Sequence, residues 1–184
     1  MITVISPAKK LSNECYAYEA DHSQPFYLNR STELVNQLKS YDPSHLQSLM
    51  GISEKLSVLN WERFQSWEPS FNSDNSRQAF FTFRGDTYSG LDADTLSSQD
   101  LSFSQNHTRI LSGLYGVLKP LDLIMPYRLE MGTKIENKSG KNLYEFWGDM
   151  LASDLEKDLE SHESKFLVNC ASVEYFKSID KDAL

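Results

Sequence analysis

Two short polar segments hold side chains that could perform nucleophilic or acid–base chemistry. Ser6 and Lys9 have the S-x-x-K spacing of acyl-transfer enzymes, in which a lysine activates a serine nucleophile. Asp86 and Tyr88 follow an expected strand and could exchange protons with a substrate beside Arg84. No K-T-G triplet, the usual companion of S-x-x-K, is present. We therefore expect Lys9 to present its charge to an anion. An enzyme with Ser6, Lys9, Asp86 and Tyr88 as reactive groups remains the alternative.

A third candidate is the stretch 109–132, where glycines and cations lie close together. The apolar residues Ile110 and Leu114 follow a helical spacing that runs into Gly113 and Gly116, which favours a helix, a tight turn and a second element. Glycines at such a bend allow close packing of another backbone, or they let backbone N–H groups bind a phosphate. Both interpretations remain open from these residues alone.

Charge is unevenly distributed along the chain. The net charge is −8, which argues against nucleic-acid binding because phosphate contacts depend on Lys and Arg. Residues 105–141, however, hold six basic side chains against three acidic ones, so this segment is +3 and the remainder is −11. Such a contrast can direct an anionic ligand to one cleft while the rest of the surface repels it.

Several functional classes are disfavoured by composition. No apolar run approaches the length of about 20 residues that crosses a bilayer, and the first residues lack the charged start of a signal peptide, so we expect a cytoplasmic protein without membrane contact. Cys15 and Cys170 form no disulfide framework, and the four histidines show no metal-binding spacing. We expect no metal and no cofactor. A ferritin-like iron site is disfavoured because it needs Glu-x-x-His pairs on helices, and none of the expected helices contains one.

The elements that must position these groups alternate between strands and helices. Apolar and β-branched runs predict strands at 2–5, 78–84 and 165–170. Amphipathic patterns with capping residues predict helices at 30–38, from 43, at 53–61, through Arg109, at 143–160 and from 172. A cation lies at or just beyond the end of each predicted strand: Lys9, Arg84 and Lys177. One shared cleft at the strand ends is therefore expected. The length fits a single domain, 1–184.

Six blocks of sequence together resemble the YaaA family of bacterial peroxide-stress proteins. The blocks occur in the same order and cover essentially the whole chain: SPAK at 6–9, FRGDTYSGL at 83–91, LSGLYGVLKPLD at 111–122, PYRLEM at 126–131, LYEFWG at 143–148 and ASVEYFK at 171–177. The resemblance implies a cytoplasmic α+β fold of unusual topology, with a mixed sheet surrounded by helices and a helix-hairpin-helix-like element near 105–126.

The resemblance also implies a function. It implies a protein induced by hydrogen peroxide that limits iron-dependent damage and binds duplex DNA, without strong sequence preference, through a positively charged cleft and the hairpin at 113–119. Carried over by position, the phosphate-binding candidates are Lys9, Lys55, Arg84, Arg109, Gly113, Gly116, Lys119, Arg128 and Lys177. Gly113 and Gly116 are three positions apart, whereas such hairpins usually place their glycines two apart.

Two functional classes remain after this comparison. The favoured one is a DNA-binding protein rather than an enzyme, and the alternative is an enzyme acting on a small anionic or nucleotide substrate in the same cleft. Family members continue past the position of Leu184 with further Lys and Arg residues, so we expect a truncated chain that binds DNA weakly and lacks the last part of the family fold.

Overall fold

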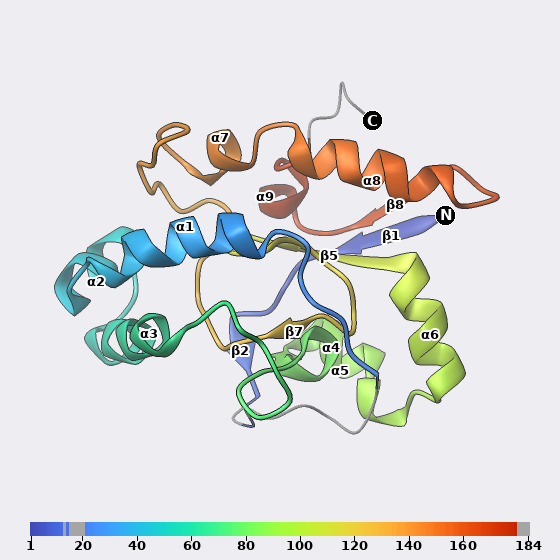
Figure 1. Ribbon diagram of the computed structural model, residues 1–184, viewed down its shortest axis with the longest axis horizontal. Coiled ribbons are helices and arrows are strands. Elements are labelled where there is room, and N and C mark those ends of the chain that lie inside the picture. Colours follow the sequence, from blue (N-terminus) through green and yellow to red (C-terminus); the bar gives the residue numbers. More distant parts are fainter. Residues whose placement is uncertain (13, 15–20, 180–184) are drawn as a thin grey trace.

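The computed structural model describes residues 1–12, 14 and 21–179, and a four-stranded mixed sheet forms its centre (Figure 1). The strand order is β6-β5-β1-β8. The strands are β1 (Ile2–Ile5), β5 (Thr108–Ser112), β6 (Gly116–Leu118) and β8 (Leu167–Cys170). β1 is parallel to both β5 and β8, whereas β5 and β6 form an antiparallel hairpin. The predicted strands at 2–5 and 165–170 are therefore confirmed.

Two small antiparallel pairs lie beside this sheet. β2 (Lys10–Leu11) pairs with β4 (Phe83–Arg84), and β3 (Arg77–Gln78) pairs with β7 (Leu123–Ile124). The continuous strand predicted at 78–84 is wrong, because the helical turn α4 (Ala79–Thr82) interrupts it. The Thr82 hydroxyl donates to the carbonyls of Gln78 and Arg77, which stabilises that turn. All four α4 side chains are buried, so aromatic content alone did not separate strand from helix.

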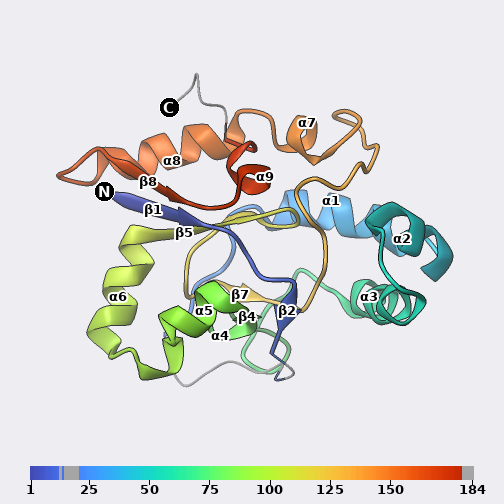
Figure 2. The same ribbon diagram turned by 180° about the vertical axis from the view of Figure 1, so that it is seen from behind.

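Helices surround the sheet on several sides. Those not yet named are α1 (Leu28–Lys39), α2 (Pro43–Met50), α3 (Glu54–Ser66), α5 (Asp86–Leu91), a 3-10 turn (Ala93–Thr95), α6 (Ser98–His107), α7 (Leu143–Trp147), α8 (Met150–Glu160) and α9 (Val173–Phe176). In Figures 1 and 2, α7 and α8 run along one edge of the molecule, α1 to α3 gather at one end, and α6 lies at the other. The predicted α+β class is confirmed.

Local sequence signals explain most helix boundaries. The carboxylate of Asp42 accepts the His45 N–H at the start of α2, and Ser53 caps α3. The helix predicted at 143–160 is divided in two at Gly148, whose φ of +49° lies in the left-handed region that glycine tolerates best. This break turns α8 away from α7.

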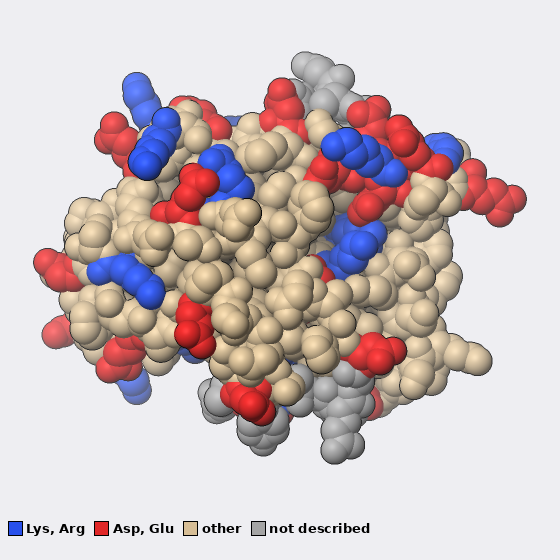
Figure 3. Space-filling view, in the orientation of Figure 1, with Lys and Arg blue, Asp and Glu red and all other residues tan. Residues whose placement is uncertain are grey.

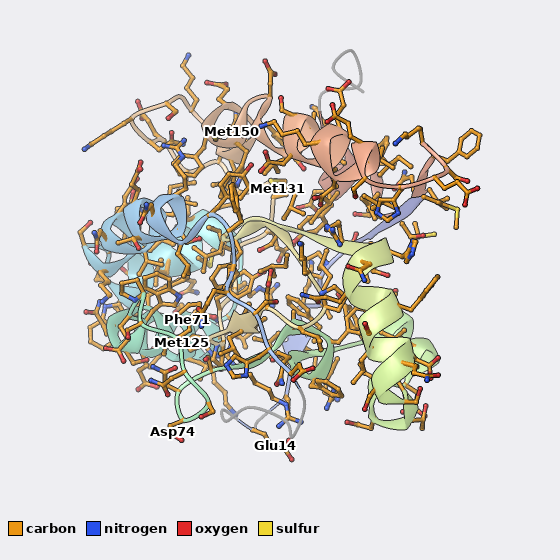
Figure 4. The ribbon with its side chains drawn as sticks, turned by 45° about the vertical axis from the view of Figure 1, so that its right-hand side comes forward. Glu14, Phe71, Asp74, Met125, Met131 and Met150 are labelled. Atoms are coloured by element: carbon orange, nitrogen blue, oxygen red, sulfur yellow. The ribbon has the colours of Figure 1, made fainter. Side chains whose placement is uncertain are left out.

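Aromatic side chains fill the space between the sheet and α3. Trp67 is buried at the end of α3, and its indole N–H donates to the Tyr115 hydroxyl over 3.0 Å. The Phe71 ring lies 6.1 Å from that of Tyr115, whose hydroxyl donates to the carbonyl of Met125. Phe71 and Met125 are labelled on this side of the molecule in Figure 4. Trp67, Phe71 and Tyr115 are all buried and therefore belong to the core.

No helix among the described residues combines the length and apolar character that spanning a bilayer requires. The face in Figure 3 shows Lys and Arg side chains scattered among acidic ones, with Asp and Glu concentrated over α8. Electrostatic attraction of an anion to this face must therefore depend on local arrangements of charge.

Candidate anion-binding site

The stretch expected to hold a helix-hairpin-helix is a β-hairpin. The chain leaves α6 at His107, continues as β5, turns at 113–115 and returns as β6. The predicted helix-hairpin-helix-like element at 105–126 is therefore wrong. Ile110 and Leu111 are both fully buried because β5 lies inside the sheet, so the strand lacks the alternation that marks a half-exposed strand. A continuous apolar run cannot be distinguished from a buried helix by periodicity.

Close packing accounts for both glycines of this turn. A Cβ on Gly113 would lie 2.3 Å from the Leu129 carbonyl oxygen, and one on Gly116 would lie 2.9 Å from the Trp147 ring. Gly116 also has a φ of +71°. The Trp147 indole N–H donates to the Gly113 carbonyl over 3.1 Å. Of the two interpretations left open by the sequence, this geometry supports packing.

A cavity of about 420 Å³ opens beside the hairpin and brings together cations from the predicted stretch. We call it the Arg109 cavity. The residues that line it come from the segment before α1, from α6, from the hairpin and its following turn, and from α8. Its charged side chains are Arg109, Lys119, Asp122, Asp154, Lys157 and Asp158. Cations and carboxylates thus occur in equal number around one concave surface.

Arg109 forms a fixed wall of this cavity. Its Nε donates to the Asp158 carboxylate over 2.7 Å, and its NH1 donates to the carbonyls of Gln105 and Thr108. The residue is only 3% exposed. A guanidinium held this way keeps its orientation, and its charge is largely matched by Asp158.

Lys119 and Asp122 are the two charged residues of the turn that follows the hairpin. Lys119 is exposed, and in the described part of the chain no carboxylate lies within ion-pairing distance of its ammonium. Asp122 is 3% exposed and accepts hydrogen bonds from the Ser23 hydroxyl and the Lys119 backbone N–H. Burial raises the pKa of Asp122 to about 6, although these hydrogen bonds and the charges of Lys119 and Arg109 oppose the shift. This carboxyl can therefore change its charge near neutral pH.

The raised pKa of Asp122 predicts a pH-dependent stability. The folded protein binds this proton more tightly than the unfolded chain, so ionised Asp122 lowers the free energy of unfolding as pH rises from about 4 to about 6. Asp122→Asn keeps both hydrogen bonds if its amide donates to Ser23, but it cannot ionise. We expect the stability difference between wild type and D122N to change by up to about 3 kcal/mol between pH 4 and pH 7. Urea unfolding at several pH values measures it, and a constant difference would contradict the assignment.

The strand-end residues proposed for catalysis are bonded to other partners. The Ser6 hydroxyl accepts the Ser172 N–H over 2.9 Å, and the Ser6 carbonyl accepts the Tyr88 hydroxyl over 2.9 Å. Lys9 and Arg128 both pair with Glu130 over 2.8 Å. The cavity between them measures only about 60 Å³. Ser6 is thus held by Ser172, and Lys9 and Arg128 share a single carboxylate.

The remaining candidates are dispersed over the molecule. Arg84 lies 4.0 Å from Asp94, and Asp86 is exposed at the start of α5. The Lys177 ammonium lies 5.1 Å from the Tyr144 ring and borders a third cavity. Lys55 is exposed in the first turn of α3. The predicted cations therefore do not converge on one cavity: Arg109 and Lys119 line the Arg109 cavity, whereas Lys9 and Arg128 meet at Glu130.

Sequence reasoning missed the contribution of α8 to the Arg109 cavity. Two acidic residues of this helix bind other parts of the chain: Asp158 binds Arg109, and Asp154 accepts a hydrogen bond from the Tyr27 hydroxyl. The spacing of Asp154 and Asp158, one helical turn apart, was the signal that both point to the same side.

Comparison with known proteins shows the family of this chain. The sequence model described as "Peroxide stress protein YaaA" matches residues 1–184. The chain belongs to this family. A UPF0246 protein of Pseudoalteromonas translucida is 52% identical over 100% of this chain and 71% of its own length. A second, from Hahella chejuensis, is 49% identical over 100% of this chain and 72% of its own length.

A third YaaA-family relative, the UPF0246 protein of Shewanella amazonensis, is 51% identical over 97% of this chain and 70% of its own length. The family is thus one of peroxide-stress proteins.

Proposed function

We propose that this YaaA-family protein acts in the peroxide response by binding duplex DNA without strong sequence preference, and so protects against iron-dependent oxidative damage. The observation that carries the proposal is the Lys119 ammonium, which has no carboxylate within ion-pairing distance among the described residues and lines a cavity whose wall is the fixed guanidinium of Arg109. An ammonium without a carboxylate partner is free to neutralise a phosphate, and the neighbouring cation adds to the attraction.

The charges around this cavity set the strength of the expected interaction. Lys157 lies 3.5 Å from Asp154, and Arg109 is paired with Asp158, so these two cations are already partly neutralised. Few phosphates can therefore be neutralised by this surface. We expect weak binding with a shallow dependence on salt, in keeping with the acidic net charge of −8.

Binding of a fluorescent DNA duplex should weaken as salt is raised, and Lys119→Ala should reduce it further. Removing one phosphate contact is expected to decrease the slope of log K against log salt by about 0.9. Lys134→Ala is the matched control, because this exposed lysine lies in the same basic segment but does not line the Arg109 cavity. Fluorescence anisotropy measures both variants.

Two results would contradict this proposal. One is the absence of any salt-sensitive binding at low ionic strength. The other is that K119A binds the duplex as tightly as K134A and the wild type do. Equal binding by all three proteins would mean that the Lys119 ammonium makes no contact beyond non-specific attraction.

A second candidate function is supported by Asp122. A buried carboxyl whose pKa is raised to about 6 beside cations in a cavity is typical of an enzyme site, and about 420 Å³ suits a small ligand. We therefore propose as the alternative an enzyme acting on a small anionic or nucleotide substrate, in which Asp122 replaces Ser6, Lys9, Asp86 and Tyr88 as the proton donor or acceptor. This candidate would be favoured over DNA binding if a mononucleotide raised the melting temperature of the wild type but not of K119A, and if the wild type did not bind the DNA duplex.

A further inference from the structure

An exposed aromatic side chain stands at the rim of the Arg109 cavity. Phe26 lies in the segment that leads into α1 (Figure 1), and it lines the cavity together with Arg109 and Lys119. The residue is 80% exposed. A single exposed ring is common on protein surfaces, but this one borders a concave surface that also holds cations. Its position therefore makes it a candidate for contact with a ligand.

One face of the Phe26 ring is open. The Tyr27 ring meets it edge to face, with centroids 5.0 Å apart and planes at 85°. Tyr27 is itself fixed, because its hydroxyl donates to the carbonyl of Met150 and to the carboxylate of Asp154. An edge-to-face contact covers at most one face of a ring. Phe26 thus has a supported position and a free face on which a flat group can stack.

The interior of the cavity suits a neutral flat group better than a phosphate. Arg109 is paired with Asp158, and Lys157 lies 3.5 Å from Asp154, so a carboxylate accompanies each of these cations and would repel an entering anion. The apolar part of the wall is formed by Phe26, Tyr27, Val117 and Leu155. A nucleobase is flat and carries no charge, and about 420 Å³ lies in the range of pockets that hold small ligands.

Lys119 supplies the charge that a nucleotide needs beside its base. It is exposed at the same cavity, and no carboxylate among the described residues lies within ion-pairing distance of its ammonium. A phosphate at the rim would meet this cation while the base attached to it enters the cavity. The exposed ring and the exposed ammonium therefore match the two ends of one ligand.

A paired base cannot make the contact with Phe26. Bases in a duplex are stacked between their neighbours, whereas an unpaired base offers a face to an aromatic ring. Such stacking tolerates every base. The groups that could read a base edge are engaged with each other, since Gln105 accepts the Leu121 N–H and donates to the Ser23 hydroxyl. That hydroxyl in turn donates to Asp122. Binding should therefore depend little on which base is present.

We propose that the Arg109 cavity binds one unpaired nucleotide of a DNA strand, with its base stacked on Phe26 and a flanking phosphate at Lys119. This inference rests on the proposed binding of DNA at the same cavity. It adds a preference for DNA that contains unpaired nucleotides, such as a single strand or a bubble, over a continuous duplex.

Fluorescence anisotropy with a labelled single strand and a duplex of equal length tests the stacking contact. We expect Phe26→Ala to weaken binding of the single strand by about fivefold or more, as for the loss of one stacked base, and to leave binding of the duplex nearly unchanged. The salt slope of F26A should equal that of the wild type, because a ring neutralises no phosphate. Lys119→Ala should instead reduce the slope for the single strand by about 0.7.

Phe26→Trp provides a direct signal of stacking. The indole should restore binding of the single strand, and a base stacked on it should quench fluorescence beyond the change seen in the wild type under the same titration. Restored binding without extra quenching would contradict a base on this ring.

Phe166→Ala is the matched control, because this residue is 71% exposed and does not line the cavity. The inference is overturned if the wild type does not bind the single strand, or if F26A binds it as tightly as F166A does. Duplex binding that still depended on Lys119 would then leave the proposed function standing by itself. Conversely, single-strand binding that F26A weakens, without any duplex binding, would support the unpaired nucleotide and remove the duplex proposal.

Thymidine monophosphate distinguishes a free nucleotide from one in a strand. We expect it to compete with the labelled single strand more weakly than an unlabelled strand does, because a strand offers further phosphates to the surrounding cations. Tighter binding of the mononucleotide than of the strand would overturn DNA as the source of the ligand.

Discussion

Replacing Gly113 with alanine is expected to lower the free energy of unfolding by about 3 kcal/mol, at the upper end of what overpacking usually costs. The added Cβ would lie 2.3 Å from the Leu129 carbonyl oxygen and 3.1 Å from the carbonyl carbons of Leu129 and Glu130. All three atoms are backbone, so no side chain can rotate away to make room. The turn between β5 and β6 must therefore move away from the segment at 129–130.

Gly90→Ala provides the matched control for this substitution. A Cβ on Gly90 would meet nothing within 4 Å, and the residue lies in helix α5, where alanine is favoured over glycine. For a domain of this size we expect G113A to lower the melting temperature by about 6–12 °C, whereas G90A should leave it unchanged or raise it. Calorimetry of both variants measures the contrast. Equal melting temperatures would show that the packing against Leu129 is looser than described.

Arg109→Ala is expected to destabilise the protein by about 2–3 kcal/mol. Truncation removes three hydrogen bonds and leaves the carboxylate of Asp158 without its partner, together with the carbonyls of Gln105 and Thr108. The Asp158 side chain is 36% exposed, so water compensates in part, and the expected loss lies below that of a fully buried pair.

The comparison variant for Arg109 is Lys157→Ala. Its ammonium is 72% exposed and lies 3.5 Å from Asp154, so its removal should change stability little. Urea unfolding of the two variants should separate the buried pair from the exposed one, and equal losses would contradict the structural role of Arg109.

Because R109A is expected to disturb β5 and α8, a loss of DNA binding in that variant could not be assigned to a phosphate contact. Lys119 is the better probe of function.

Strand β1 and several helices of this fold were predictable because their sequence patterns are local. The run at 2–5 is short, β-branched and bounded by Ser6 and Pro7, and Asp42 and Ser53 cap the helices that follow them. The hairpin at 108–118 was not predictable in this way. Its apolar residues are buried on both faces, and that burial depends on β1, which lies far away in sequence.

The candidate site was predicted only in part, for the same physical reason. Arg109, Lys119 and Asp122 belong to one basic stretch, and the sequence identifies them together. Their partners come from elsewhere: Ser23 precedes α1, and Asp158 lies on α8. Sequence alone also placed Lys9 and Arg128 among free cations, since nothing local indicates that Glu130 pairs with both.

The position of β1 in the sheet has a consequence for synthesis. This strand leaves the ribosome before either of its two neighbours, which are β5, paired with it at 108–110, and β8, paired with it at 167–170. Ile2 and Val4, both fully buried in the folded protein, therefore lack β5 until residue 110 has been made and lack β8 until residue 170 has been made. Sheets built from such distant pairings fold slowly and expose apolar surface meanwhile. The nascent chain should accordingly depend on chaperones until β8 has emerged.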